Sequence, residues 1–373
     1  MKKHHIHVVA LDVPYPADYG AIIDCYYRLD ALRKAGVSVT LHAFEYGRGE
    51  RKELLDVVDE VIYYKRKTGI SQLLSGLPYI VKSRMVPELV DNLCKDNDPI
   101  FFEGQHTCGY LQDERLKNRL KMVRIHNIEW EYYALLNERT AVLKNRIFYW
   151  LESKKLKRFD SVLKSADVLF CVSHQDLEHY RKLHPRVILM PSSSPFHIPE
   201  TTNPQRERYA IYHANLSVEE NEEAATWILE AYERFDSPMP LVITGKNPSE
   251  ELIQQASRIP DVQLVASPDA ATMQSLIEKA GVQLLITFQN AGIKLKLINS
   301  LVSGGVCIAN RDMINGTDLG QFCQIVTTKY EFIESLRHID DLYPDVSARL
   351  EHMRKHYDPS ETVKRIVEVL EKR

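Results

Sequence analysis

The sequence NAGIKLKLINSLVSGGVCIAN, residues 290–310, contains the pattern that decides the fold. An apolar run, VQLLITF, leads into it and has the composition of a buried strand. Apolar residues at helical spacing come next, and a Gly-Gly pair ends that segment before a second apolar run, VCIAN. The stretch therefore predicts a strand, a helix over about 293–302 and a second strand parallel to the first.

Two lysines, Lys294 and Lys296, fall in the first turn of this predicted helix. The N-terminus of a helix has free N–H groups and a partial positive charge, so it favours anions and disfavours cations. Gly292 permits a ligand to approach the backbone closely. We therefore expect an anion such as a diphosphate between the lysines and the helix. The alternative is that both lysines face solvent and bind nothing.

The same alternation of strands and helices runs along the whole chain, which predicts an α/β fold with parallel sheets. Strands are expected at residues 5–13, 37–44, 58–64, 99–103, 121–127, 167–173, 186–191, 209–215, 240–245, 262–267, 282–288, 306–310 and 324–328. Helices in the first half are expected near residues 21–35, 86–96, 110–119, 129–165 and 174–183.

The stretch PSSSPFHIPETTNPQ, residues 191–205, is rich in Pro, Ser and Thr and has no periodicity. It separates two α/β halves, and a chain of 373 residues is longer than a single core usually supports. We therefore expect two Rossmann-like domains facing each other across a cleft, at residues 1–192 and 207–354, with a linker at 193–206. The segment 355–373 is expected to form an amphipathic helix that could pack on either domain.

Composition excludes several classes of protein. The net charge of −3 argues against nucleic acid as a partner. No apolar run reaches the roughly 18 residues that a membrane-spanning helix needs, and the N-terminus is predicted to be a strand, not a signal peptide. The six cysteines show no CxxC pair, which favours reduced thiols and the cytoplasm. No metal-ligand motif is visible, so no metal site is expected.

Parallel sheets bind ligands beyond the carboxyl ends of their strands, so the residues at those ends are the candidates for function. In the first half, Gly20 opens a helix, although a GxGxxG fingerprint is absent. Glu103 and His106 follow one strand and are candidates for an acceptor or cleft site. His126 ends the next strand and is the catalytic candidate, because Asn127 can cap the following helix while the imidazole remains free. The alternatives are a capping role for Glu103 and surface or core positions for the histidines.

In the second half, His213 and Asn215 lie between a strand and the acidic start of a helix. Gly245 and Lys246 end the next strand, in a position that suits contact with a phosphate or a base. Lys246 can equally be a solvent-exposed side chain.

Three of these stretches resemble the GT-B glycosyltransferases, and specifically the retaining, nucleotide-sugar-dependent enzymes of the glycosyl transferases group 1 type. GIKLKLINSLVSGGVCIAN resembles the donor segment E-G-F-G-L-P-x-x-E-A-M-A-x-G-x-P-V-V-A of that group. YHANLSVEENEEAATWI is similar to the opening of its second domain, and Gly20 matches the glycine that opens the first helix near the donor phosphates. The resemblance implies an N-terminal acceptor domain, a C-terminal donor domain and a last helix that crosses back to the first domain.

The resemblance also implies roles for individual residues. It places Gly292, Ile293 and Lys294 along the donor diphosphate, with Lys296 close by. Asn299 takes the position of the glutamate that holds the ribose hydroxyls. His126 matches, in placement, the strand-end histidine near the transferred sugar.

The implied function is transfer of a hexose from a UDP- or GDP-sugar to a hydroxyl of a glycan or lipid-linked acceptor, in polysaccharide biosynthesis. Helix dipoles and basic side chains would stabilise the leaving diphosphate, so neither a metal nor another cofactor is expected. The basic and apolar segments at 64–85 and 139–159 suit contact with an anionic membrane at its inner face, or form solvated helix faces over buried aromatic residues.

The sequence departs from the family pattern where carboxylates are expected. The Glu-x₇-Glu pair falls on Ala291 and Asn299, and Ala214 and Val306 replace an expected glycine and proline. Two alternatives therefore stay open: a non-catalytic protein of this fold that binds a nucleotide or a partner, and an enzyme similar to the UDP-sugar 2-epimerases.

Overall fold

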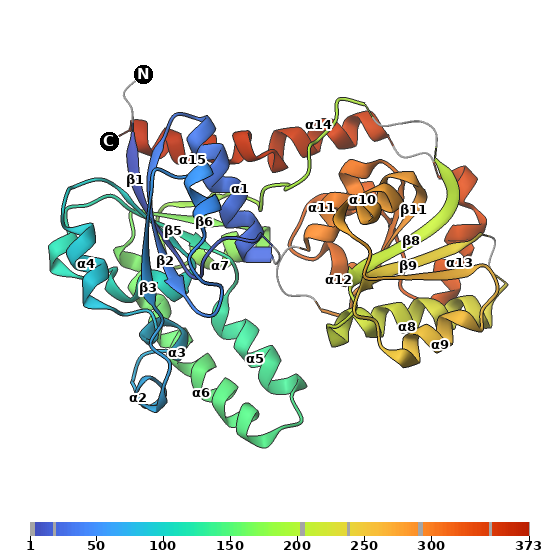
Figure 1. Cartoon of the computed structure of the whole chain (residues 1–373), viewed down its shortest axis with the longest axis horizontal. Helices are drawn as coiled ribbons and strands as arrows, with labels where there is room; N and C mark the ends of the chain where they lie inside the picture. The colour runs from blue at the N-terminus through green and yellow to red at the C-terminus, as the bar shows by residue number, and fades with distance from the viewer. Residues whose placement is uncertain are drawn as a thin grey trace. The chain divides into compact units, whose positions relative to one another are not determined.

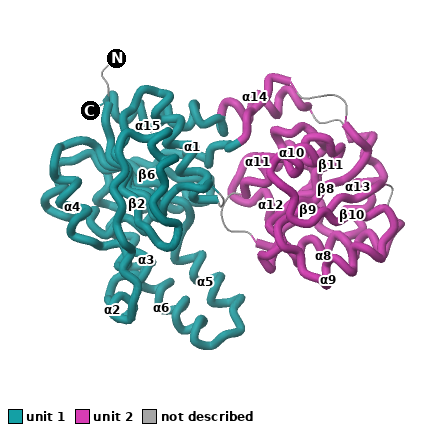
Figure 2. Tube along the Cα trace, viewed as in Figure 1, with its two compact units in different colours: residues 1–195, 356–373 teal, residues 196–355 magenta. Residues whose placement is uncertain are grey.

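The computed structural model describes residues 4–17, 20–201, 206–236, 239–289, 294–342 and 345–372. The chain forms two compact units (Figure 2). Unit 1 comprises residues 1–195 together with 356–373, and unit 2 comprises residues 196–355. The C-terminal segment therefore belongs to the same unit as the N-terminus, and Figure 1 shows both termini on that unit.

Unit 1 is built on a seven-stranded sheet in the order β3-β2-β1-β4-β5-β6-β7. Every strand pair is parallel, and the order of strands reverses between β1 and β4, as in Rossmann folds. The strands are β1 (His5–Ala10), β2 (Ser38–Glu45), β3 (Glu60–Lys65), β4 (Ile100–Glu103), β5 (Lys121–Ile125), β6 (Val168–Cys171) and β7 (Val187–Leu189).

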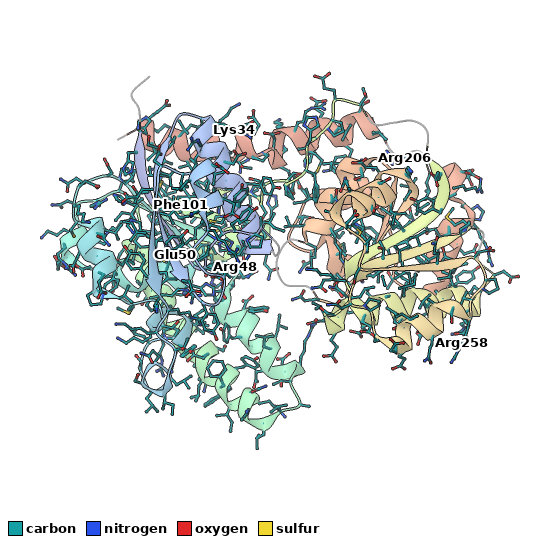
Figure 3. All side chains as sticks on the ribbon, viewed as in Figure 1. Lys34, Arg48, Glu50, Phe101, Arg206 and Arg258 are labelled. Atoms are coloured by element: carbon teal, nitrogen blue, oxygen red, sulfur yellow. The ribbon has the colours of Figure 1, made fainter. Side chains whose placement is uncertain are left out.

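Helices cover both faces of this sheet. They are α1 (Gly20–Lys34), α2 (Ile70–Leu73), α3 (Tyr79–Lys82), α4 (Pro87–Leu93), α5 (Glu129–Arg139), α6 (Leu143–Phe159), α7 (His174–Arg181) and α15 (Pro359–Glu371). Successive strand residues point to opposite faces, so neighbours such as Phe101 and Phe102 enter two different cores. Phe101 lies in the buried interior whereas Lys34 lies at the surface (Figure 3).

The C-terminal helix α15 packs against α1 on one face of the unit 1 sheet (Figure 1). Asp358 caps it, because its side chain accepts a hydrogen bond from the backbone N–H of Ser360. Val363, Ile366 and Leu370 are buried in the core that α1 and β1 share. This helix begins at Pro359, and a separate helix, α14 (Val346–Tyr357), precedes it.

Two helix expectations in the first half were wrong. Residues 129–165 form α5 and α6 rather than one helix, because Thr140 and Val142 between them have extended backbone, which β-branched residues favour. The expected helix at 110–119 is replaced by two short 3-10 segments, Gln105–Tyr110 and Glu114–Leu116. The side chain of Asp113 accepts a hydrogen bond from the N–H of Arg115. This cap begins the second segment at Glu114, separate from the first.

Unit 2 repeats the architecture with a six-stranded parallel sheet in the order β10-β9-β8-β11-β12-β13. Its strands are β8 (Glu207–Asn215), β9 (Leu241–Lys246), β10 (Val262–Ala266), β11 (Ala280–Leu285), β12 (Val306–Ala309) and β13 (Gln324–Ile325). Its helices are α8 (Glu219–Arg234), α9 (Glu250–Ser257), α10 (Ala270–Lys279), α11 (Leu295–Ser303), α12 (Arg311–Ile314) and α13 (Lys329–Arg337), and α14 follows them. The reversal of strand order falls between β8 and β11.

The stretch at 290–310 adopts the predicted strand–helix–strand arrangement. Helix α11 runs from Leu295 to Ser303 between the parallel neighbours β11 and β12. It ends at Gly304, whose φ of 101° lies in the left-handed region that favours glycine. Lys294 occupies the N-cap position, and residues 290–293 lie outside the described part of the chain.

Among the described helices, none combines the length and the apolar character that crossing a bilayer requires. All six cysteines are free, and four of them are buried; of these four, Cys171 and Cys307 lie in the apolar strands β6 and β12.

Candidate functional site

In unit 2, Lys294 and Lys296 lie at the N-terminus of α11, the helix that follows β11 at the reversal of strand order. The Nζ atom of Lys296 donates to the carbonyl oxygen of Ile286 at 3.3 Å, to Oδ1 of Asn221 at 3.4 Å and to the hydroxyl of Tyr212 at 3.5 Å. The Nζ atom of Lys294 donates to the backbone carbonyl of Asp312 at 3.3 Å. Each of these acceptors is a neutral oxygen at long distance.

Neither lysine forms an ion pair with any residue that the structure describes. Burial lowers the pKa of Lys294 to about 8, although the charge of Asp312 opposes this shift. Burial lowers the pKa of Lys296 to about 7, and the charge of Lys294 adds to the effect. A bound anion would restore both charges, because it would replace the lost hydration and oppose the repulsion between the lysines. The geometry thus suits a diphosphate.

His213 lies close to this pair of lysines. It is buried in β8, and its Nε2 atom is 3.2 Å from Oγ of Ser300 on α11. Burial, and next the charge of Lys296, lower the pKa of His213 to about 3. The imidazole is therefore neutral, and it holds α11 against β8 without adding a third charge.

Asn215 ends β8 and organises the turn into α8. Its Oδ1 atom accepts from the N–H of Ser217 at 3.2 Å, and its backbone carbonyl accepts from the side chain of Asn221 at 3.0 Å. Asn221 in turn accepts from Lys296, so the turn and the lysine are linked. Sequence reasoning missed Asn221, because an asparagine inside an acidic helix start carries no distinguishing signal.

Asn299 is buried on α11, where its Nδ2 atom lies 3.4 Å from Oε1 of Gln274 on α10. Its side chain also lies 3.4 Å from the hydroxyl of Ser303. These contacts join α11 to α10. The ribose-binding role implied by the resemblance stays a prediction.

Gly245 and Lys246 end β9, the neighbour of β8. A Cβ atom at position 245 would lie 1.8 Å from the carbonyl oxygen of Ala214, so the strand contact alone requires glycine there. Lys246 is exposed. Gly292 and Ile293, the other expected donor residues, lie outside the described residues.

In unit 1, Glu103 at the end of β4 belongs to a buried group of charges. Arg28 donates to Oε1 of Glu103 from Nε at 3.0 Å and from Nη2 at 2.5 Å, and to Asp24 at 2.7 Å. Arg124 on β5 donates to the same Asp24 oxygen at 2.9 Å. Burial alone would raise the pKa of each carboxyl, but the guanidinium groups hold both below their usual range. Two acids and two bases thus compensate one another, and we call these four residues the unit 1 charge cluster.

His126 adjoins the charge cluster at the carboxyl end of β5. Its Nε2 atom is 3.3 Å from Oε2 of Glu103, and a tenth of its side chain is exposed. A carboxylate beside an imidazole can fix the orientation of the ring. The structure therefore brings Glu103 and His126 together, as an oriented dyad at the strand ends.

His106 and His126 both lie against the position that a Cβ atom of residue 104 would take. Gly104 has φ of +77°, and a Cβ there would lie 3.1 Å from Nδ1 of His106 and 3.2 Å from Cδ2 of His126. Nδ1 of His106 is 3.9 Å from Glu129, and burial lowers the pKa of His106. Burial raises the pKa of Glu129 to about 8, so this carboxyl is protonated near pH 7 and can donate a hydrogen bond.

Gly20 is the first residue of α1 and is exposed. No described atom lies within 4 Å of the Cβ position there, so packing does not explain the glycine.

Sequence reasoning missed Asp24, Arg28, Arg124 and Glu129. One signal was available: Arg124 is a charged residue inside an otherwise apolar strand, KMVRI, and such a residue needs a buried partner.

No protein-family model matches the chain. An "Uncharacterized 44.6 kDa protein in cps region" of Klebsiella pneumoniae is 25% identical over 369 residues, which cover 92% of each protein.

Solved structures resemble the whole chain. Anabaena Alr3699/HepE in complex with UDP-glucose has a TM-score of 0.67 at 12% identity, covering 99% of this chain and 100% of that one. The pneumococcal O-GlcNAc transferase GtfA in complex with UDP and GlcNAc has a TM-score of 0.64 at 11% identity, covering 100% and 99%. The apo form of the lipopolysaccharide outer core galactosyltransferase WaaB has a TM-score of 0.64 at 10% identity, covering 99% and 100%.

At these identities the likeness concerns the fold. Two parallel sheets in Rossmann order, matched over the full chain by glycosyltransferases, confirm the architecture that the sequence predicts: the chain has the GT-B glycosyltransferase fold.

Proposed function

We propose that this protein is a glycosyltransferase that moves a hexose from a UDP- or GDP-sugar to a hydroxyl of a glycan or lipid-linked acceptor. The observation that carries the proposal is the pair Lys294 and Lys296, two half-buried cations at a helix N-terminus with no ion pair among the described residues. Solved structures with this fold are complexes with UDP, with UDP-glucose and with UDP and GlcNAc. Those ligands support a nucleotide-sugar as the donor here.

In this proposal the two lysines and the N-terminus of α11 stabilise the charge that develops on the departing nucleoside diphosphate. Fixed cations in a partly desolvated position do so without reorganisation, which is the condition under which electrostatic catalysis is strongest. The reaction breaks the bond between the sugar anomeric carbon and the diphosphate oxygen and forms one to the acceptor oxygen. The acceptor hydroxyl proton passes to His126 or to an oxygen of the departing diphosphate.

His126 is the residue we assign to the sugar or to the acceptor hydroxyl. Its contact with Glu103 supports this role, because an oriented imidazole can donate a hydrogen bond to a hydroxyl or accept its proton. His106 and the protonated carboxyl of Glu129 offer further hydrogen-bond partners beside it.

The relative from Klebsiella pneumoniae supports a place in polysaccharide biosynthesis, since its name locates it in a cps region. A second candidate function is nucleotide or partner binding without transfer. Two observations favour this alternative. Ala291 stands where the family has a carboxylate in the catalytic site, and the side chain of Asn299 already contacts Gln274 on α10.

The first experiment titrates UDP and GDP into the purified protein by calorimetry. The double variant Lys294→Ala/Lys296→Ala should lose about a hundredfold or more in affinity, because each charged hydrogen bond to a phosphate contributes about 1.5–3 kcal/mol. Lys279→Ala, an exposed lysine at the end of α10, is the matched control and should bind like the wild type. Equal binding by the double variant would contradict the assignment.

The second experiment separates the candidate functions. Slow hydrolysis of a UDP- or GDP-sugar, accelerated by an acceptor glycan, supports transfer. Tight nucleotide binding without turnover across a broad acceptor panel supports the non-catalytic alternative. Interconversion of epimeric UDP-sugars without acceptor would instead indicate an epimerase.

We also propose that unit 1 rests on an anionic membrane surface on the cytoplasmic side. Helices α5 and α6 form a hairpin that projects from unit 1, with α2 beside it (Figure 1). Eight of the thirteen exposed large apolar residues in the described part of the chain lie on α2, α6 and the turns next to them, and we call these eight the hairpin patch: Ile70, Leu73, Leu74, Val142, Leu143, Ile147, Trp150 and Leu151. The ammonium group of Lys155 on α6 donates to the carbonyl of Leu73 on α2 at 3.0 Å, and this hydrogen bond joins α6 to α2.

Basic side chains flank the hairpin patch, and Lys154 lies 3.7 Å from the ring centroid of Trp150. An apolar surface bordered by lysines suits insertion at the level of anionic headgroups. Sedimentation with vesicles containing phosphatidylserine should show binding that falls about tenfold or more in Leu143→Glu/Trp150→Glu. Tyr330→Glu, which changes an exposed aromatic residue of unit 2, is the control. Equal binding by all three proteins would contradict this proposal.

A further inference from the structure

Four potential metal ligands meet at the amino end of the unit 1 sheet. His5 and His7 lie two residues apart on β1, so their side chains share one face of the strand. Asp96 and Asp98 come from the segment that precedes β4. One ligand atom from each of the four residues lies within 4.8 Å of the others. The sequence shows no metal-ligand spacing, because the paired residues His7 and Asp96 are 89 positions apart.

The four residues are already arranged in pairs. Nδ1 of His5 is 2.8 Å from Oδ2 of Asp98, and Nε2 of His7 is 3.0 and 2.9 Å from the two carboxylate oxygens of Asp96. The rings of His5 and His7 meet edge to face, with centroids 5.1 Å apart. Two imidazole nitrogens and two carboxylates thus surround one small volume.

Outer partners fix the direction of both imidazoles. Nε2 of His5 is 3.1 Å from Oγ1 of Thr40, and Nδ1 of His7 is 2.9 Å from Nε2 of His42. His42 is in turn 2.8 Å from the hydroxyl of Tyr64. Histidines that bind metals commonly hold their second nitrogen in this way, because the outer hydrogen bond sets the tautomer and the ring orientation.

We propose that His5, His7, Asp96 and Asp98 bind one divalent transition-metal ion of the Zn²⁺ type. Imidazole and carboxylate ligands suit Zn²⁺ in a tetrahedral arrangement with metal–ligand bonds of about 2.0–2.2 Å. Ligand atoms around such an ion lie about 3.4 Å apart, so each His–Asp contact opens by roughly half an ångström when the metal enters. Solvent reaches the group, since the side chains of His5, Asp96 and Asp98 are 30, 37 and 43% exposed.

The electrostatics of the group admit a cation. Asp96 and Asp98 contribute two negative charges, and Arg119 compensates part of them from 3.2 Å. A divalent ion would replace the His–Asp hydrogen bonds and share Asp96 with Arg119.

The group lies at the amino ends of the strands, whereas Glu103 and His126 lie at the carboxyl ends of β4 and β5. The bound ion would therefore tie the Asp96–Asp98 segment to β1 and stabilise unit 1, without a role in transfer. This inference is independent of the proposed function.

The test uses the full chain, freed of metal by EDTA and dialysis. Calorimetry with Zn²⁺ should show about one ion bound per chain, and Co²⁺ should give the strong visible absorption of a tetrahedral site. His5→Gln and Asp98→Asn change half-exposed ligands, so both variants should fold, and circular dichroism checks this. Each should bind Zn²⁺ at least about tenfold more weakly, a loss that even outer-partner changes reach.

His4→Gln is the matched control, because it removes the histidine that directly precedes β1 and leaves the four ligands unchanged. It should bind Zn²⁺ like the wild type. Zn²⁺ should raise the melting temperature of the wild type and of His4→Gln but not of His5→Gln/Asp98→Asn. Equal Zn²⁺ affinity in that double variant, or no binding to the wild type at millimolar Zn²⁺, would overturn the proposal. UDP affinity, measured with and without EDTA, should be the same.

Discussion

The two units hold their charged residues in opposite ways. In the unit 1 charge cluster, Asp24 and Glu103 face Arg28 and Arg124 at 2.5–3.0 Å, and all four side chains are buried. In unit 2, Lys294 and Lys296 donate only to neutral oxygens at 3.3–3.5 Å within the described residues.

The difference separates a rigid support from a binding site. A buried cluster with balanced charge satisfies itself and holds a neighbouring group, here His126, in one orientation. Two half-buried cations without compensation cost the free protein stability, and a bound anion recovers that cost. Uncompensated charge is therefore the better indicator of where a ligand belongs.

The largest expected effect comes from breaking the compensation in unit 1. Arg124→Met should lower the free energy of unfolding by about 3–5 kcal/mol, because it leaves Asp24 short of a buried partner. Lys296→Met should leave stability unchanged or raise it by about 1 kcal/mol, since it removes an uncompensated cation. Urea unfolding of both variants and the wild type measures the two effects. Equal destabilisation by the two substitutions would remove the basis of the comparison.

The second effect concerns His126. His126→Ala should slow sugar transfer about a hundredfold, the usual contribution of a positioned proton-transfer group, while UDP affinity changes by less than about twofold. Kinetics of transfer and calorimetry with UDP measure the two quantities separately.

His174→Ala is the control for that variant, because His174 is an exposed histidine that follows the strand β6. It should leave both quantities unchanged. An equal loss of transfer and of UDP affinity in His126→Ala would place His126 with the nucleotide.

The smallest effect is the pH dependence of UDP binding. In the free protein the pKa values of Lys296 and Lys294 are about 7 and about 8, so Lys296 is already mostly neutral at pH 7.5 and Lys294 loses its proton as pH rises to 9.5. UDP needs the protonated forms, and its affinity should therefore fall at least about tenfold over this range. Lys294→Arg/Lys296→Arg keeps its charge and should show a flatter profile. An affinity that rises with pH would contradict the assignment.

Much of the fold was predictable because it depends on local pattern. Alternating strands and helices, the linker and the Gly-Gly end of α11 are all visible in the sequence, and the strand–helix–strand unit at 290–310 was confirmed. The break at Thr140 and the 3-10 segments near Asp113 were missed, because the first depends on two β-branched residues in an otherwise helical run and the second on a single side-chain cap.

The sites were less predictable, since they depend on contacts between distant residues. The strand-end rule found Glu103 and His126, but it could not show that Arg28, 75 residues away from Glu103, holds that carboxylate. Nor could it show that Gly245 is required by Ala214 rather than by a ligand. The lysines at the start of α11 were found because a helix N-terminus disfavours positive charge, so two lysines there call for an explanation.

The central claim is that Lys294 and Lys296 hold a nucleoside diphosphate by regaining their charges. Calorimetric titration of UDP at pH 8, in two buffers with different ionisation enthalpies, measures the protons taken up on binding. The second ionisation of a phosphate lies near pH 6, so the ligand itself contributes little at pH 8. With free-protein pKa values of about 8 for Lys294 and about 7 for Lys296, about half of the first and nine tenths of the second side chain are neutral at pH 8. Regaining both charges therefore requires uptake of about 1.4 protons per UDP bound. Tight binding without proton uptake would contradict the claim.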